Sequence, residues 1–183
     1  GVMTTVSLSP YRAALTPLTD IIAAVPDWSA PSPCEDWSAL DVLDHVLMTQ
    51  RGLLAERGIA LTPDPDIPAD PAAAWREHST MVAGLLDDPQ ISGIAYDGFF
   101  GPTTLGETMD RFYVFDMLVH RWDLARAAGT DTSFTDAELD LIEASAASFG
   151  PMLYMDGICR SGVEAPADAD RQTRVLAMLG RRG

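Results

Sequence analysis

The stretch FYVFDMLVHRWDLAR, residues 112–126, decides the fold class of this chain. It is almost wholly apolar, and Asp116 and His120 interrupt it four residues apart. On a helix with about 100° per residue, Asp116, His120 and Asp123 fall within a strip roughly 60° wide. A helix that is apolar nearly all round is buried, and a buried carboxylate beside an imidazole needs a compensating partner. A divalent metal ion is one such partner.

Helical periodicity recurs outside this stretch. Three predicted helices begin with a capping box, in which a Ser or Thr is followed three residues later by an acidic residue. These boxes are Ser38 with Asp41, Thr104 with Glu107 and Thr135 with Glu138. The predicted helices cover residues 8–25, 38–57, 72–86, 104–128 and 135–149, and Pro17 is expected to weaken or kink the first. The predicted fold is all-α.

The remaining segments lack a sustained period. Residues 58–71 contain four prolines and are predicted to be a loop. Residues 87–104 are apolar but irregular, so we expect an ordered loop that packs on the helices. Residues 151–183 are predicted to be an irregular tail with at most a short turn at 176–179. Four long helices with connections of very different length indicate a bundle with a long crossover. The length of the chain predicts a single domain over 1–183.

Composition excludes several classes of partner. The 183 residues include 27 acidic and 12 basic residues, for a net charge of -15. Nucleic acid and an anionic membrane are therefore not expected partners. Cys34 and Cys159 are too few for a disulfide framework, and no secretion signal or long apolar run is evident, so a cytoplasmic location is expected. Gly1 and Val2 before Met3 look like a cloning remnant.

Three side chains form a candidate metal-ligand set. Asp116 and His120 lie on one helical face, and His45 lies at the rim of the apolar face of the helix predicted over 38–57. Two imidazoles and a carboxylate are a ligand set that catalytic zinc sites use, and they also suit iron, nickel or manganese. The alternative from the residues alone is a core histidine, His120, hydrogen-bonded to Asp116, with His45 unrelated to either.

Three segments of the sequence resemble a known superfamily. They are CEDWSALDVLDHV at 34–46, FDMLVHRWDLARAAG at 115–129 and VEAPADADRQTRVLAMLGR at 163–181. They are similar to the recurrent segments of the DinB/YfiT-like metalloproteins, and within them to the actinobacterial branch that includes the N-terminal metal-binding domain of mycothiol-dependent maleylpyruvate isomerase.

The resemblance implies a fold and a site. The implied fold is an antiparallel four-helix bundle, to which this chain adds a fifth helix and its tail. The implied ligands fall on His45, Asp116 and His120, and the metal would be zinc, with nickel, iron and manganese as alternatives. Asp116 departs from the branch, where Glu is common at this position. Trp122 is interpreted as a packing residue. Asp123 is interpreted as a residue that contacts a metal ligand or forms an ion pair.

The resemblance also implies a function. It favours a thiol-dependent metalloenzyme, an isomerase or S-transferase, in which mycothiol is the thiol cosubstrate and the substrate is a small electrophile. Maleylpyruvate isomerase itself is not expected, because that enzyme resembles this bundle with a further C-terminal domain. The alternative is a non-catalytic bundle, metal-binding or metal-free, that serves as a stress-related binding module. A homodimer is compatible with either interpretation.

Two further residues are candidates for the site. His78 has an inward-compatible spacing in the helix predicted over 72–86, where a role near the metal competes with a satisfied or surface histidine. Cys34 precedes the helix that carries His45, and packing at the helix entry is favoured over a role as a nucleophile.

Overall fold

The computed structural model describes residues 8–154 and 162–182. Within these ranges it is mostly helical, which confirms the predicted helical class. The chain divides into two compact units, Gly1–Thr130 and Asp131–Gly183. The single domain over 1–183 remains a prediction beside this division.

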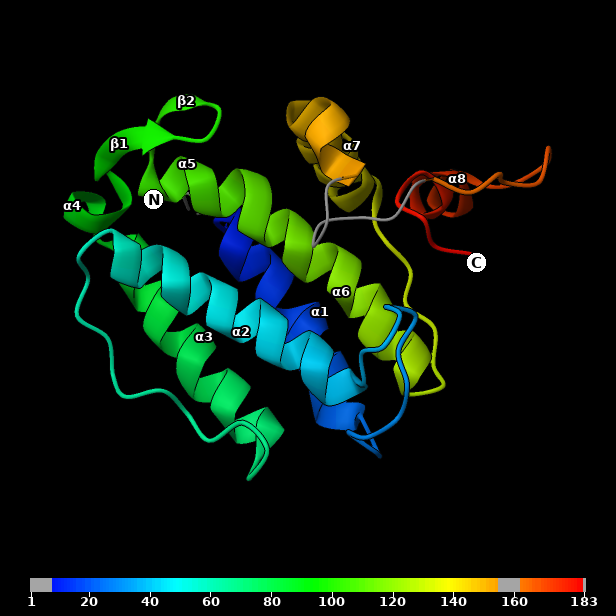
Figure 1. Cartoon of the computed structure of the whole chain (residues 1–183), viewed down its shortest axis with the longest axis horizontal. Helices are drawn as coiled ribbons and strands as arrows, with labels where there is room; N and C mark the ends of the chain where they lie inside the picture. The colour runs from blue at the N-terminus through cyan, green and yellow to red at the C-terminus, as the bar shows by residue number, and fades with distance from the viewer. Residues whose placement is uncertain (1–7, 155–161, 183) are drawn as a thin grey trace, which may run out of the picture. The chain divides into compact units, whose positions relative to one another are not determined.

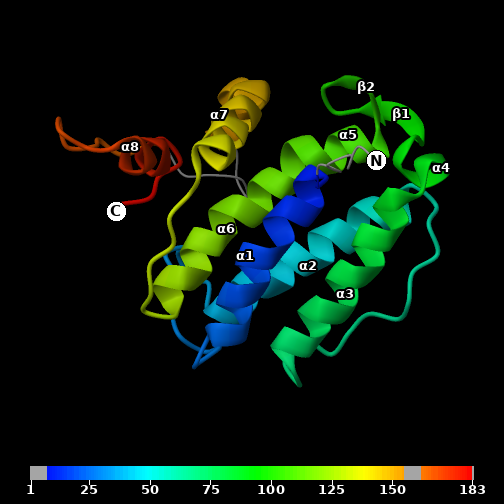
Figure 2. The same cartoon turned by 180° about the vertical axis from the view of Figure 1, so that it is seen from behind.

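Four long helices dominate the first unit, and they lie side by side in both views (Figures 1 and 2). They are α1 (Pro10–Ala24), α2 (Ala39–Glu56), α3 (Pro71–Asp87) and α6 (Val114–Ala127). Both α1 and α2 pack against α3 and α6. The first three match their predicted ranges to within two residues, and α1 continues through Pro17.

Local capping explains where these helices begin. At the start of α2, the Ser38 hydroxyl accepts the Asp41 amide at 3.2 Å, and the Asp41 carboxylate accepts the Ser38 amide at 2.9 Å. Ser9 and Asp70 cap α1 and α3 with their side chains, and each of these helices has a proline in its first turn. These interactions satisfy amides that have no partner inside the helix.

The segment expected to be an ordered loop over 87–104 instead contains regular structure. A short helix α4 (Pro89–Ser92) precedes an antiparallel hairpin of β1 (Ala95–Gly98) and β2 (Gly101–Thr104), in which Tyr96 pairs with Thr103. Each strand has four residues, which is too short for an alternating pattern to stand out in the sequence.

The helix predicted over 104–128 is divided into three parts. It comprises α5 (Leu105–Thr108), a π-helical turn (Met109–Tyr113) and α6. In the π-helical turn, the Val114 amide bonds to the Met109 carbonyl, five residues back. The wider turn changes the angular offset between side chains before and after it, directly ahead of Asp116. Apolar periodicity carries no signature of such a turn, and the sequence therefore did not reveal it.

The α6 helix is buried almost throughout, as its composition predicts. Its buried positions include every residue from Met117 to Ala125, whereas Asp116 is partly exposed. Asp116 therefore stands where the buried face of α6 meets solvent.

The second unit contains α7 (Asp136–Phe149), a 3-10 turn (Gly150–Tyr154) and α8 (Arg171–Met178). The α8 helix corrects the prediction of an irregular tail. Asp170 caps it by accepting the Thr173 amide at 2.8 Å, and Arg171 donates to Asp140 and Glu143 of α7 at 2.6 Å and 3.1 Å. The helix has eight residues, and its links to α7 are long-range, so local periodicity did not reveal it.

Candidate metal centre

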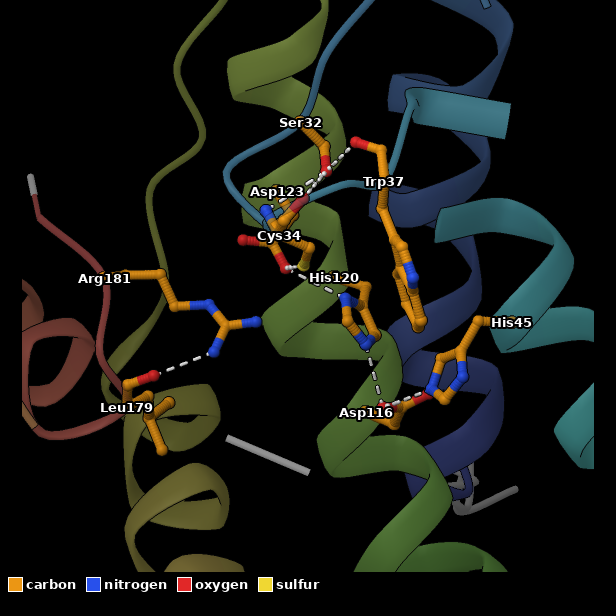
Figure 3. A network of polar contacts seen from close by, with 9 residues as sticks. All are labelled: Ser32, Cys34, Trp37, His45, Asp116, His120, Asp123, Leu179 and Arg181. Carbon is orange, nitrogen blue, oxygen red and sulfur yellow. Dashed lines mark hydrogen bonds and ion pairs between the residues drawn. The ribbon is translucent and has the colours of Figure 1, made fainter. Parts of the chain in front are cut away.

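Two helices bring the three predicted ligands together. His45 lies in the second turn of α2, and Asp116 and His120 lie one turn apart on α6. Asp116 Oδ1 is 3.3 Å from His45 Nε2 and 3.1 Å from His120 Nε2. Figure 3 shows the three side chains pointing toward one another, with the carboxylate between the two imidazoles.

The spacing of these atoms fits a metal centre. In a tetrahedral site with bonds of about 2.0–2.1 Å, neighbouring ligand atoms lie roughly 3.3–3.4 Å apart. The two carboxylate–imidazole distances, 3.3 Å and 3.1 Å, are close to this value. One ligand atom from each of His45, Asp116 and His120 lies within 4.8 Å of the others. The shorter side chain of Asp116, where Glu is common in the related branch, thus still reaches both histidines.

The cluster is more exposed on one side than on the other. The His45 and Asp116 side chains are 22% and 26% exposed, whereas His120 is 7% exposed. A hollow of about 580 Å³ borders His45 and is lined by Asp36, Trp37, Asp41, Asp44, His45, Met48 and Thr49. Among the three proposed ligands, His45 borders this hollow.

An aromatic side chain covers part of the cluster. The Trp37 ring lies 5.0 Å from the His45 ring and 6.4 Å from the His120 ring, measured between centroids. The two imidazoles meet edge to face at 5.1 Å. Trp37 thus restricts the space that the two histidine rings can occupy.

The charges of Asp116 and His120 depend on each other. Burial favours neutral forms, but the positive charge of His120 and the hydrogen bonds from His120 and His45 hold the pKa of Asp116 below its usual value. Likewise, burial would lower the pKa of His120, but the charge of Asp116 and hydrogen bonding hold it well above its usual value. Without a metal ion, each of the two groups therefore favours the charged form of the other. A metal ion bound by His120 Nε2 would take the place of a proton there.

A second set of contacts lies behind His120. His120 Nδ1 is 2.9 Å from Asp123 Oδ2, and the Cys34 thiol donates to the same oxygen at 3.3 Å. Asp123 is fully buried and Cys34 is partly buried. In Figure 3, Cys34 and Asp123 lie at the Nδ1 edge of the His120 ring, whereas Asp116 faces Nε2.

The other candidate residues have different surroundings. His78 is buried on α3, and its Nε2 atom lies 2.8 Å from Gln50 Oε1. It belongs to neither group of residues that could hold a metal ion. Trp122 is buried in the core and carries the Arg126 guanidinium over its ring. Cys159 lies outside the described residues.

The sequence missed the contact between Cys34 and Asp123. Asp123 stands out in the sequence because it lies three residues after His120 on the same helical strip. No local pattern, however, relates it to a thiol 89 residues away.

Fold and site together define a class of protein. The chain is a mostly helical protein in which two histidines and an aspartate from two helices converge in an arrangement that fits a metal ion. Within residues 8–154 and 162–182, no helix combines the length and apolar character needed to cross a membrane.

Comparison with known proteins identifies the family. Residues 11–125 match the family described as the mycothiol maleylpyruvate isomerase N-terminal domain, and the chain belongs to that family. The matched residues all lie in the first compact unit. The chain is also similar to two uncharacterized proteins of Mycobacterium tuberculosis, from strains CDC 1551 / Oshkosh and ATCC 25618 / H37Rv. Each is 31% identical over 163 residues, which is 82% of this chain and 83% of the relative. No solved structure matches significantly.

Proposed function

We propose that this chain binds a divalent metal ion through His45, Asp116 and His120 and uses it in thiol-dependent chemistry on a small electrophile. Zinc is the expected ion, and nickel, iron and manganese are alternatives for the same ligand types. We further propose that α1, α2, α3 and α6 form the antiparallel four-helix bundle of the family. Mycothiol is the proposed thiol, because the matching family is described by that cofactor.

One observation carries the proposal. Three potential ligand atoms from two helices lie within 4.8 Å of one another at a position open to solvent through His45 and Asp116. Three protein ligands and one open position are the usual arrangement of a catalytic zinc site. A sealed four-ligand site would instead favour a purely structural metal.

The metal would supply a specific chemistry. A divalent ion held by these residues would stabilise the thiolate of a bound thiol, which is the nucleophile that both an isomerase and an S-transferase need. Asp116 contributes the single negative charge of the ligand set. His120, the most buried of the three, is held by its neighbours, whereas His45 and Asp116 lie on the side from which a thiol would approach.

Metal analysis and calorimetry test the proposal. Protein purified without added chelator should contain about one divalent ion per chain, and zinc titrated into stripped protein should bind at one site. His45→Ala and His120→Ala should abolish this site. The matched control is His78→Gln, which removes the remaining histidine of the chain and should leave zinc binding unchanged.

Titration with mycothiol is the second step. The thiol should bind the zinc-loaded protein and should bind the stripped protein at least about ten-fold more weakly. Equal affinity for the two forms would contradict the thiol-dependent mechanism. Failure of the wild-type chain to bind any divalent ion would contradict the metal site itself.

A second function is supported by the same cluster. Asp116 Oδ1 is within hydrogen-bond distance of both imidazoles, so the Nε2 atom of each ring has a partner without an ion. This arrangement suits a metal-free binding module, the alternative that the sequence left open. It predicts that chelators leave the thermal unfolding temperature unchanged, whereas the metal-binding function predicts a lower unfolding temperature after metal is removed.

A further inference from the structure

We propose that Asp123 and Cys34 are positioning residues that hold the His120 ring with its Nε2 atom directed at His45 and Asp116. The proposal rests on the metal site described above and assigns roles to two residues outside the ligand set. It also assigns a role to the loop between α1 and α2, which supplies Cys34.

The contact with Asp123 determines which nitrogen keeps its proton. Asp123 Oδ2 lies 2.9 Å from His120 Nδ1, and a carboxylate can only accept a hydrogen bond. Nδ1 therefore carries a proton that Asp123 holds. Nε2, which faces Asp116 and His45, is then the nitrogen whose proton a metal ion would replace. Asp123 is fully buried, so water does not replace this hydrogen bond. Carboxylates behind metal-binding histidines commonly fix the ring in this way.

Cys34 supports the same carboxylate. Its thiol donates to Asp123 Oδ2 at 3.3 Å, so this oxygen has a donor from α6 and another from the loop. An acceptor with two donors has less freedom to rotate toward other partners. We infer that Cys34 holds the Asp123 carboxylate in the plane that His120 Nδ1 requires.

The loop that presents Cys34 is closed by its own hydrogen bonds. The Ser32 hydroxyl donates to the Trp37 carbonyl at 2.7 Å and accepts the Cys34 amide at 3.1 Å. The Trp37 amide donates to the Cys34 carbonyl at 3.0 Å. One tight turn thereby directs a thiol to Asp123 and an indole ring toward His45 and His120 (Figure 3).

A competing interpretation makes Cys34 a metal ligand. Cys34, His120 and Asp123 also offer ligand atoms within 4.8 Å of one another. A metal there would take Nδ1 of His120 and break its hydrogen bond to Asp123. If both ligand sets held an ion, two metals would have to share one imidazole ring stripped of both protons. In the positioning role, Nε2 faces the metal and Nδ1 keeps its proton, so His120 and Asp123 keep the hydrogen bond that the structure shows.

Four variants test the proposal. Asp123→Asn removes the charge with little change in shape, Cys34→Ala removes the thiol donor, and Cys34→Ser restores a donor of similar size. Asp20→Asn, on the exposed face of α1, is the matched control for loss of a carboxylate. Zinc affinity should fall about 10–100-fold in Asp123→Asn and less in Cys34→Ala. It should recover in Cys34→Ser and remain unchanged in Asp20→Asn.

Nitrogen-15 NMR of the histidine rings gives a readout that altered stability alone would not reproduce. Zinc-loaded wild-type protein should show a slowly exchanging proton on His120 Nδ1, with Nε2 bound to the metal. Asp123→Asn should lose the slow exchange. Cobalt-substituted protein should lack a thiolate-to-cobalt absorption band, and the presence of this band in wild type but not in Cys34→Ser would overturn the proposal in favour of ligation by Cys34.

The outcomes separate this inference from the metal site itself. If wild type binds no metal, the proposed function fails, and the His120 Nδ1 proton in metal-free protein still reports the pairing with Asp123. If wild type binds zinc but Asp123→Asn and Cys34→Ala bind it equally well, the positioning role is wrong and the site stands. If Asp123→Asn does not fold, the comparison of Cys34→Ala with Cys34→Ser decides.

Discussion

Asp116 Oδ1 lies 3.3 Å from His45 Nε2, although the two residues are 71 positions apart in the chain. This contact joins α2 to α6 and completes the set of three potential ligands. The two side chains are the more exposed members of the cluster, so they border the open side of the candidate metal centre. Substitution of either residue should therefore affect metal binding more than it affects the core.

Asp116 is the first target because it is the only anionic member of the proposed ligand set. Asp116→Asn keeps the shape of the side chain but removes its charge. Zinc affinity should therefore fall by more than the roughly 10–100-fold that is typical when a residue hydrogen-bonded to a ligand is substituted. Asp116→Glu should bind zinc within about ten-fold of wild type, because it keeps the negative charge and the carboxylate oxygen. Calorimetric zinc titration measures both, with Asp97→Asn on the exposed hairpin as the control. Wild-type affinity in Asp116→Asn would contradict its assignment as a ligand.

His78 should make stability depend on pH. Burial, assisted by the positive charge of Arg51, lowers the pKa of His78 to about 3. An exposed histidine in the unfolded chain has a pKa of about 6.5. Below that pH the unfolded chain takes up a proton that the folded protein does not, so the free energy of unfolding falls as the pH falls toward 3.

The variant His78→Gln isolates this effect. Between about pH 7 and pH 5, wild type should lose about 2 kcal/mol more unfolding free energy than His78→Gln. Urea unfolding at several pH values gives the difference, in which contributions common to the two proteins cancel. Identical pH dependence of the two proteins would show that His78 is not the cause.

Arg51 should anchor the loop between α2 and α3. Its side chain is 6% exposed and donates to the Asp64 carboxylate at 2.9 Å and to the Thr62 carbonyl. Lysine lacks the guanidinium fork that serves both acceptors, so Arg51→Lys should cost about 1–3 kcal/mol of unfolding free energy. Arg12→Lys is the matched control, because Arg12 forms an exposed pair with Asp87 and its substitution should change stability much less. Equal effects of the two substitutions would refute the anchoring role.

Asp36 occupies a backbone conformation that favours glycine, with φ at 66°. The left-handed region costs a non-glycine residue roughly 1–2 kcal/mol, and the extra chain entropy of unfolded glycine offsets roughly 0.5–1 kcal/mol of the gain. Asp36→Gly should therefore be as stable as wild type or up to about 1 kcal/mol more stable. Asp36→Ala should be less stable than Asp36→Gly by about 1 kcal/mol, as denaturant unfolding would show. The reverse order would contradict the strain at this turn.

The sequence by itself determined the long helices and part of the site. Apolar periodicity and capping residues act within a few positions of the chain, so Ser38 and Asp41 mark the start of α2 without reference to any distant contact. The spacing of Asp116, His120 and Asp123 on one helical strip is likewise a local property. Elements whose stability rests on distant contacts, such as the four-residue strands and α8, left no comparable pattern.

Only the tertiary structure decided how these local features combine. By sequence alone, His45 could equally be an unrelated rim residue, and the packing of α2 against α6 is what places its Nε2 atom beside Asp116. Cys34 is linked to the site only because the loop brings its thiol to Asp123. The physical reason is that helix formation depends on neighbours in sequence, whereas the faces that meet depend on burial of apolar surface across the whole unit. The polar strip on α6 can thus be predicted from the sequence, whereas its contacts with His45 and Cys34 depend on the fold.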